Sequence, residues 1–99
     1  MHLDFEGSEV LVDLKGESSV RSSVTGDVVE RVQVGLRAKN REEQRKFLET
    51  IQKAKKAGIN STDGRGNIVN KWKVLNAEWS RLGNNSPEYS MVFELEELK

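Results

Sequence analysis

Apolar and polar residues alternate through much of the first forty positions, and the alternation returns after position 67, which is typical of strands with two different faces. Residues 10–14 alternate in this way, and the change of phase at Gly7-Ser8 indicates a bulge or a tight bend. Lys15-Gly16-Glu17 carries a turn signal, and residues 18–23 are polar with a weak strand pattern. Thr25-Gly26-Asp27 predicts a hairpin turn, because glycine adopts the positive φ that such turns need.

The clearest strand pattern covers residues 28–38. One of its faces holds Val28, Val32, Val34, Leu36 and Ala38, with Glu30 as the single polar exception on that face. Arg31, Gln33, Gly35 and Arg37 fall on the opposite face. A face of this kind meets water or a partner. We therefore expect Arg31, Gln33 and Arg37 to lie at an interface.

One amphipathic helix is predicted over about residues 41–57. Asn40 and Glu43 have capping-box spacing, in which the Asn side chain accepts from the Glu43 amide while the Glu43 side chain reaches back. Gly58 is the expected C-terminal residue, and the lysines before it suit the negative end of the helix dipole. The apolar residues form one narrow stripe, so the helix should pack by a single face; they are Phe47, Leu48, Ile51 and Ala54.

The rest of the chain predicts a loop followed by two strands. Residues 60–67 have loop composition, residues 68–80 form a long strand pattern, and residues 82–87 predict a turn. A change of face near Val74-Leu75 implies a bulge. Apolar residues alternate cleanly from position 89 to position 95, so an antiparallel partner for the long strand is expected. The acidic residues of this last strand are interpreted as its solvated face: Glu94, Glu96 and Glu97.

Composition limits the classes of protein that fit. Ninety-nine residues predict one domain, and 35% apolar with 32% charged residues predict a thin core. The residues expected in that core are Trp72, Phe47, Ile51, Val34 and Phe93, with Trp79 partly exposed or at an interface. A formal charge of zero argues against a generic polyanion binder, and the lack of cysteine excludes disulfides and thiolate sites. We find no signal-peptide pattern and no apolar run of roughly 20 residues, so a cytoplasmic location is expected.

Candidate chemistry is sparse, so neither an enzyme nor a bound cofactor or metal is expected. His2 is the one histidine and lies next to the initiator. Asp63-Gly64-Arg65-Gly66 fits neither the EF-hand spacing nor a phosphate-binding loop, which leads into a helix rather than a strand. We interpret residues 60–67 as a connection that a partner orders, with Asp63 and Arg65 as interface residues.

The basic residues between positions 53 and 73, interleaved with Trp72, suggest an alternative role in nucleic-acid binding. Its expected contacts are Lys53, Lys56, Arg65, Lys71 and Lys73. The lysines near the helix end also have a dipole explanation, and those beside Trp72 also fit an ordinary outward strand face. Residues 1–30 are acidic while the middle of the chain is basic. This asymmetry fits either head-to-tail stacking or simple solubility.

The element order and two C-terminal stretches resemble small tail and baseplate proteins of tailed bacteriophages. The stretches are Trp72-Lys73-Val74-Leu75-Asn76-Ala77-Glu78-Trp79 and Tyr89-Ser90-Met91-Val92-Phe93-Glu94-Leu95. Many such proteins end in a Trp-x-Val strand, a turn, and an acid-rich Tyr-x-apolar-x-Phe/Leu strand. The resemblance covers roughly residues 10–98 in organisation.

That resemblance implies a β-sandwich or rolled β-barrel flanked by one helix, whose subunits pair strand edges to form stacking rings. Residues 10–36 would correspond to the hairpin region that lines or joins the rings, although here that region is short and rich in serine. We therefore expect an α+β, mainly antiparallel protein with a non-enzymatic structural role. It would self-associate or dock with other tail or virion proteins as a tube, terminator or baseplate component, in the host cytoplasm and then in the virion. The alternative is a small nucleic-acid-binding module.

Overall fold

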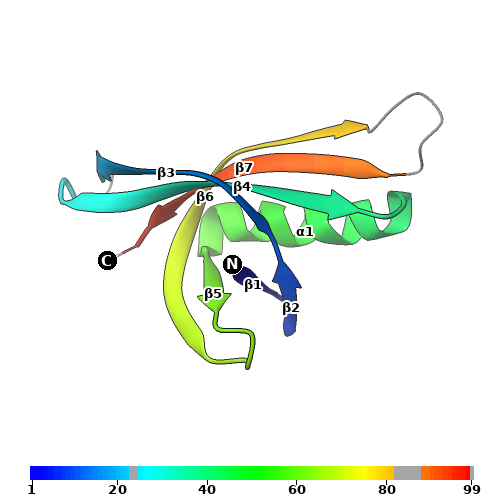
Figure 1. Ribbon diagram of the computed structural model, residues 1–99, viewed down its shortest axis with the longest axis horizontal. Helices are drawn as coiled ribbons and strands as arrows, with labels where there is room; N and C mark the ends of the chain where they lie inside the picture. The colour runs from blue at the N-terminus through cyan, green and yellow to red at the C-terminus, as the bar shows by residue number, and fades with distance from the viewer. Residues whose placement is uncertain (23–24, 82–87, 99) are drawn as a thin grey trace.

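Strands and one helix account for most of residues 1–22, 25–81 and 88–98, which are the residues that the computed structural model describes. A seven-stranded antiparallel sheet curls into a half-barrel, and the helix lies on its inner face (Figure 1). The predicted α+β, mainly antiparallel fold with one flanking helix is therefore confirmed. In chain order the elements are β1 (His2–Phe5), β2 (Ser8–Leu11), β3 (Asp13–Arg21), β4 (Val28–Ala38), α1 (Arg41–Ala57), β5 (Ile59–Thr62), β6 (Ile68–Arg81) and β7 (Tyr89–Glu97).

The two edge strands of the sheet are neighbours in sequence. The strand order is β2-β1-β5-β6-β7-β4-β3, and only Val12 separates β2 from β3. Val12 is buried, and its N–H donates to the Met1 carbonyl at 2.9 Å, one step beyond the β1–β2 pairing. The sheet therefore curls until its edges meet at Val12 and opens again beyond that point.

The N-terminal half differs from the prediction at Val12, which divides the strand pattern of residues 10–14 between β2 and β3, and at one turn. The phase change at Gly7 is the tight bend expected, a two-residue turn in which Glu6 and Gly7 both have positive φ. Lys15-Gly16-Glu17 was predicted to turn, but it lies inside the continuous strand β3, which has a bulge between Leu14 and Gly16. Pairing along β4 outweighs the local turn preference, because strand formation depends on neighbouring strands more than on intrinsic propensity.

The helix begins and ends as predicted. Asn40 Oδ1 accepts from the Glu43 N–H at 2.9 Å, whereas Glu43 Oε1 accepts from the Lys39 N–H at 3.1 Å, one residue before the predicted partner. Ile51 and Ala54 are buried against the sheet. Within the described ranges no helix is both long and apolar enough to cross a membrane.

The expected core residues lie in the core, with one at its margin. Val34, Ile51, Trp72 and Phe93 are all at most 2% exposed. Phe47 is half-buried and packs edge-to-face on a β1 aromatic ring, with 5.2 Å between ring centroids. The other predicted apolar face, on β4, holds except at its start. There Val28 is 61% exposed, because the helix covers only the opposite end of β4 (Figure 1).

The C-terminal strands follow the predicted order with one addition. Residues 60–62 were predicted to be loop, but they belong to β5, which pairs with β6, so the connecting loop is residues 63–67. The expected change of face is a bulge between Leu75 and Glu78, where Asn76 has φ 49°. This bulge turns Trp79 toward the core, where it is half-buried. The predicted turn at 82–87 lies outside the described residues.

Gly58 ends the helix at a point that leaves no room for a side chain. Its φ is 79° and its ψ 172°, and an added Cβ would lie 3.0 Å from the Trp72 carbonyl oxygen. Gly58→Ala is therefore expected to lower the free energy of unfolding by about 2–4 kcal/mol, because backbone strain and overpacking each cost about 1–3 kcal/mol. Gly26 has the same φ and open space around it, so Gly26→Ala should cost only about 1–2 kcal/mol. Urea denaturation measures both, and equal losses would contradict the close-approach explanation.

Candidate interaction surface

One edge of the sheet presents an unpaired backbone. Among the described residues β3 pairs with β4 and with no other strand, and all of its residues are exposed or half-exposed. The bulged Lys15 folds over Gly35, since a Cβ on that glycine would lie 2.9 Å from Lys15 Cε. A bulge and a lysine are common protections of an edge strand, but both lie at the start of β3. The segment from Gly16 to Arg21 has neither feature.

One hydrogen bond shows which residues of β3 direct their backbone N–H and C=O groups away from the sheet. The Ser22 N–H donates to the Asp27 carbonyl at 2.7 Å, and the β3–β4 register is unbroken from that pair back to Gly16. In an antiparallel ladder, successive residues direct their N–H and C=O groups alternately to opposite sides. Residues 16, 18 and 20 therefore bond to β4. Glu17, Ser19 and Arg21 direct their N–H and C=O groups away from the sheet.

A cavity opens on the inner face beside this edge. It measures about 290 Å³ and is lined by residues of β3, β4, β5 and β6 together with Met1. The helix does not extend to the tip of the β3–β4 hairpin or of the β5–β6 hairpin (Figure 1). Its lining includes the buried Val32 and Trp72, and also Leu14 and Val69, which are 48% and 59% exposed. Exposed large apolar side chains around a concavity are typical of interaction sites. We call this the corner cavity.

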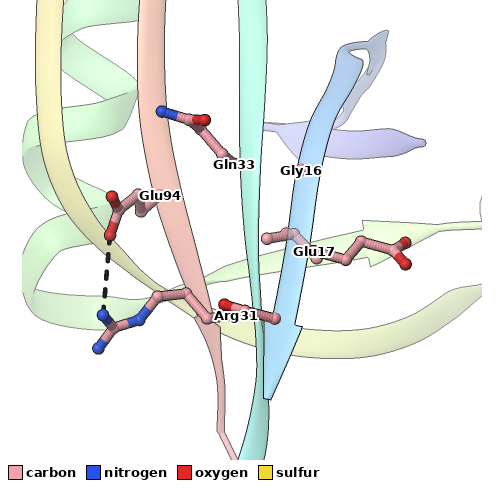
Figure 2. Close-up of a pocket in the computed structure, with 7 residues that line it drawn as sticks. Gly16, Glu17, Arg31, Gln33 and Glu94 are labelled. Carbon is pink, nitrogen blue, oxygen red and sulfur yellow. Dashed lines mark ion pairs between the residues drawn. The ribbon is translucent and has the colours of Figure 1, made fainter. Parts of the chain in front are cut away.

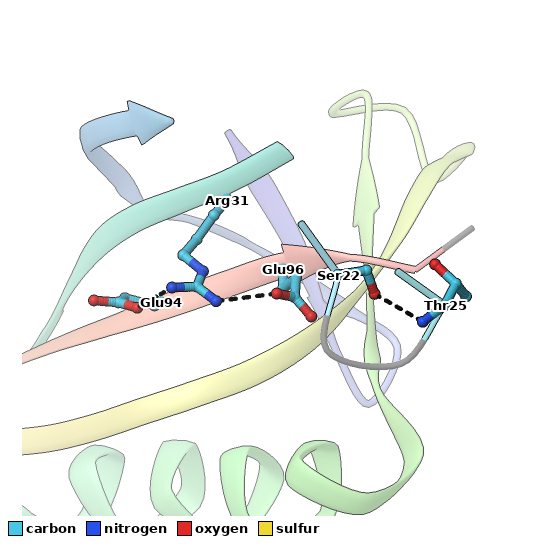
Figure 3. A network of polar contacts seen from close by, with 5 residues as sticks. All are labelled: Ser22, Thr25, Arg31, Glu94 and Glu96. Carbon is cyan, nitrogen blue, oxygen red and sulfur yellow. Dashed lines mark hydrogen bonds and ion pairs between the residues drawn. The ribbon is translucent and has the colours of Figure 1, made fainter. Parts of the chain in front are cut away.

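On the outer face, Arg31 joins β4 to β7. Its Nη2 lies 3.0 Å from Glu96 Oε1 and its Nη1 3.9 Å from Glu94 Oε2, and the Glu96 side chain is fully buried. Figure 3 shows these two ion pairs with the Ser22–Thr25 hydrogen bond of the β3–β4 turn. The prediction that Glu96 belongs to a solvated face is wrong. Register places Arg31 directly opposite Glu96, so the carboxylate is buried with its counter-charge.

Arg31 also borders a shallow hollow of about 220 Å³ (Figure 2). The hollow is lined by Gly16, Glu17, Ser18, Arg31, Val32, Gln33 and Glu94. The Arg31 side chain is 34% exposed, and its Nε is buried with no hydrogen-bond partner among the described residues. The Nε end of the guanidinium is thus held inside the protein. Gln33 and Arg37 of β4 are exposed, as the alternating pattern predicted.

The other predicted interface residues lie in the β5–β6 turn. Asp63 Oδ1 accepts from the Arg65 N–H at 2.8 Å, and its Oδ2 accepts from Asn67 Nδ2 at 2.9 Å. These bonds, the Asn67 side-chain bond foremost, hold the pKa of Asp63 below its usual value. Arg65 is exposed. The five predicted residues therefore do not form one surface, since three lie along β4 and two in this turn, and their interface role stays a prediction.

The predicted nucleic-acid contacts are divided among the helix, the turn and β6. Lys53 Nζ lies 2.9 Å from Glu6 Oε1, and that hydrogen bond raises the pKa of Lys53. Lys73 is half-buried and opposite Glu96 in register, while Lys56, Arg65 and Lys71 are exposed. Trp72 is 2% exposed, and its indole N–H donates to Ser61 Oγ at 2.9 Å. It is not free to stack on a base.

Sequence reasoning missed both the β3 edge and the corner cavity. The turn signal at Lys15-Gly16-Glu17 concealed the strand, although the spacing of Val12 and Leu14 already pointed to it. Val69 reaches the cavity because an irregularity in the β5–β6 register lies beside it. A register irregularity depends on the partner strand and leaves no local signal in the sequence.

Residues 1–22, 25–81 and 88–98 contain no group of three His, Asp or Glu side chains placed to hold a metal ion. Comparison with protein-family models, curated proteins and solved structures found no match.

The Arg31–Glu96 pair should contribute much more to stability than an exposed pair. Arg31→Met removes the guanidinium that lies 3.0 Å from the buried Glu96 carboxylate, so the free energy of unfolding should fall by about 2–4 kcal/mol. Glu96→Gln in the same background should restore part of it. The matched control is Lys46→Met, which removes an exposed pair with Glu42 at 4.0 Å and should cost less than about 0.5 kcal/mol. Equal losses for the two Met variants, measured by urea denaturation, would contradict the interpretation of Glu96.

The Asp63 turn should weaken in acid. Because its pKa in the folded protein is lowered from 3.8, the stabilisation by Asp63 is complete above that value and is lost as pH falls through the lower folded pKa. A carboxyl NMR titration should give a midpoint below 3.8, and Asn67→Ala should move it upward, because it removes the principal hydrogen bond to the carboxylate. A midpoint at or above 3.8 in the wild-type protein would rule out these bonds in solution.

Proposed function

We propose that this chain is a non-enzymatic structural protein that self-associates, or docks in a larger assembly, through the free edge of its sheet. The observation that carries the proposal is the outward-facing backbone of Glu17, Ser19 and Arg21 on β3. Exposed edges readily accept another strand, and natural monomers usually cover or interrupt them. Here the edge lies open beside the exposed apolar side chains of the corner cavity.

More specifically, we propose that the chain is a tail-type component of a bacteriophage or prophage, such as a tube, terminator or baseplate protein. Its support is the resemblance in element order, together with a curled antiparallel sheet that carries one helix and two free edges. Subunits of this class build rings by pairing strand edges between neighbours. The edges β2 and β3 are where such pairing would occur in this chain.

Nucleic-acid binding is the alternative and has less support. Trp72, the aromatic residue that would stack on a base, is buried, and Lys53 forms an ion pair with Glu6. Both functions predict a complex, but they differ in their dependence on salt. Phosphate contacts release counterions, so affinity for DNA or RNA would fall steeply with salt concentration. Strand pairing depends mainly on backbone hydrogen bonds and apolar contact.

Light scattering coupled to size exclusion, over a range of protein concentrations, tests the proposal. The wild-type chain should exceed its monomer mass of 11.2 kDa as concentration rises, and negative-stain images should show any rings. Ser19→Pro removes an outward N–H and should abolish association without unfolding the monomer, because proline is tolerated at a strand edge. A mass of 11.2 kDa at every concentration would reject self-association.

Ser18→Pro is the matched control for Ser19→Pro. The Ser18 N–H bonds to β4, so its loss should lower the free energy of unfolding by about 1–3 kcal/mol. Thermal or urea unfolding of the two proline variants therefore checks the assignment of inward and outward groups independently of assembly. If Ser19→Pro proved the less stable of the two, the assigned direction of the edge would be wrong.

A further inference from the structure

The free part of β3 is complementary to itself. Glu17 lies two residues before Ser19 and Arg21 two residues after it, and all three direct their backbone groups away from β4. If a second β3 runs antiparallel with Ser19 opposite Ser19, each Glu17 faces the Arg21 of the other copy. Opposite charges directly across an antiparallel pair stabilise it, and like charges destabilise it.

The backbone restricts the registers in which two β3 strands can pair. An outward-facing residue must meet an outward-facing residue, because the two exchange hydrogen bonds. Pairing Glu17 with Glu17 sets two carboxylates against each other. Pairing Ser18 with Ser18 places Glu17 opposite Ser19 and forms no charge pair. The register centred on Ser19 forms two opposite-charge pairs, so electrostatics favours it.

The side chains that this register needs are accessible. Glu17 is exposed and makes no ion pair within residues 1–22, 25–81 and 88–98. Arg21 is exposed, and its Nη1 donates to the Gly26 carbonyl at 2.9 Å, which leaves further guanidinium donors for a carboxylate. Ser18 and Ser19 are small and exposed, so a second strand can approach closely.

We propose that two copies of this chain pair through β3 in antiparallel orientation about a two-fold axis at Ser19. The inference rests on the self-association proposed above, and its two-fold interface takes the place of the β2–β3 pairing that a ring would need. Each seven-stranded sheet would then continue into the other, with Glu17 of each copy paired to Arg21 of its partner. Such an interface is closed, because both copies use the same surface. The β2 edges would be left at the outer ends of the dimer.

Charge exchange tests the register. Glu17→Arg places two arginines opposite each other at both ends of the pair, and Arg21→Glu does the same with two glutamates. Each variant alone should associate at least about tenfold more weakly than the wild type. An equimolar mixture should recover association, because a copy carrying Glu17→Arg and a copy carrying Arg21→Glu again set an arginine opposite a glutamate at both ends. Glu78→Arg changes an exposed acid on β6 and should have no effect.

A cysteine variant tests the two-fold axis directly, because the chain has no cysteine. Residues that exchange both hydrogen bonds have Cα atoms about 5.5 Å apart, within the range of a disulfide. Ser19→Cys should therefore form a covalent dimer under mild oxidation. Ser18→Cys should not, because its two copies would be diagonal neighbours about 7–8 Å apart.

The two proposals fail in different ways. If the wild-type chain associates but the mixed charge variants do not recover, or Ser19→Cys does not cross-link, the two-fold register is overturned and another edge contact, such as β3 on β2, is responsible. If the wild-type chain stays at 11.2 kDa and Ser19→Cys gives no covalent dimer, both this register and the proposed self-association are rejected. Circular dichroism of each variant confirms that the monomer is folded.

Discussion

Val12 imposes the geometry on which the rest of the molecule depends. It is the single residue between the two edge strands, and it is buried with its N–H bonded to the Met1 carbonyl. A sheet whose first and last strands are joined by one residue must curl, yet one residue cannot bring the two edges together along their length. The result is a half-barrel with a concave inner face and two free edges, rather than a closed barrel that has none.

The helix fills only part of that concave face. Seventeen residues of helix span roughly 25 Å, whereas the longest dimension of the molecule is 45 Å. The covered end holds the tightly buried residues Val34, Ile51 and Phe93. At the other end Val28 and Val69 are 61% and 59% exposed, and on the edge strand Leu14 is 48% exposed beside the corner cavity. The helix is too short to cover this end of the inner face. The surface proposed for association is therefore this uncovered end together with the neighbouring strand β3.

The parts predicted well from sequence are those that local chemistry determines. The helix bounds follow from the Asn40 cap and from Gly58, both of which act within a few residues. The errors concern pairings between distant segments: the turn signal within β3, the loop assigned to β5, and the burial of Glu96. A strand with a weak pattern forms because a strong one lies beside it. An acidic residue is buried because register places Arg31 opposite it, and no local pattern contains that information.

The position of β7 affects how the chain can be built. β7 is the last strand in sequence, yet it lies between β4 and β6 and joins the two halves of the sheet. During synthesis, β4 would be complete well before the strand that pairs with its second edge had left the ribosome. While the helix, β5 and β6 are being synthesised, the edge of β4 that pairs with β7 would have no partner strand. The half-barrel thus cannot form progressively from its N-terminus, and its assembly waits on contacts between segments far apart in the chain, which are the slow contacts in folding.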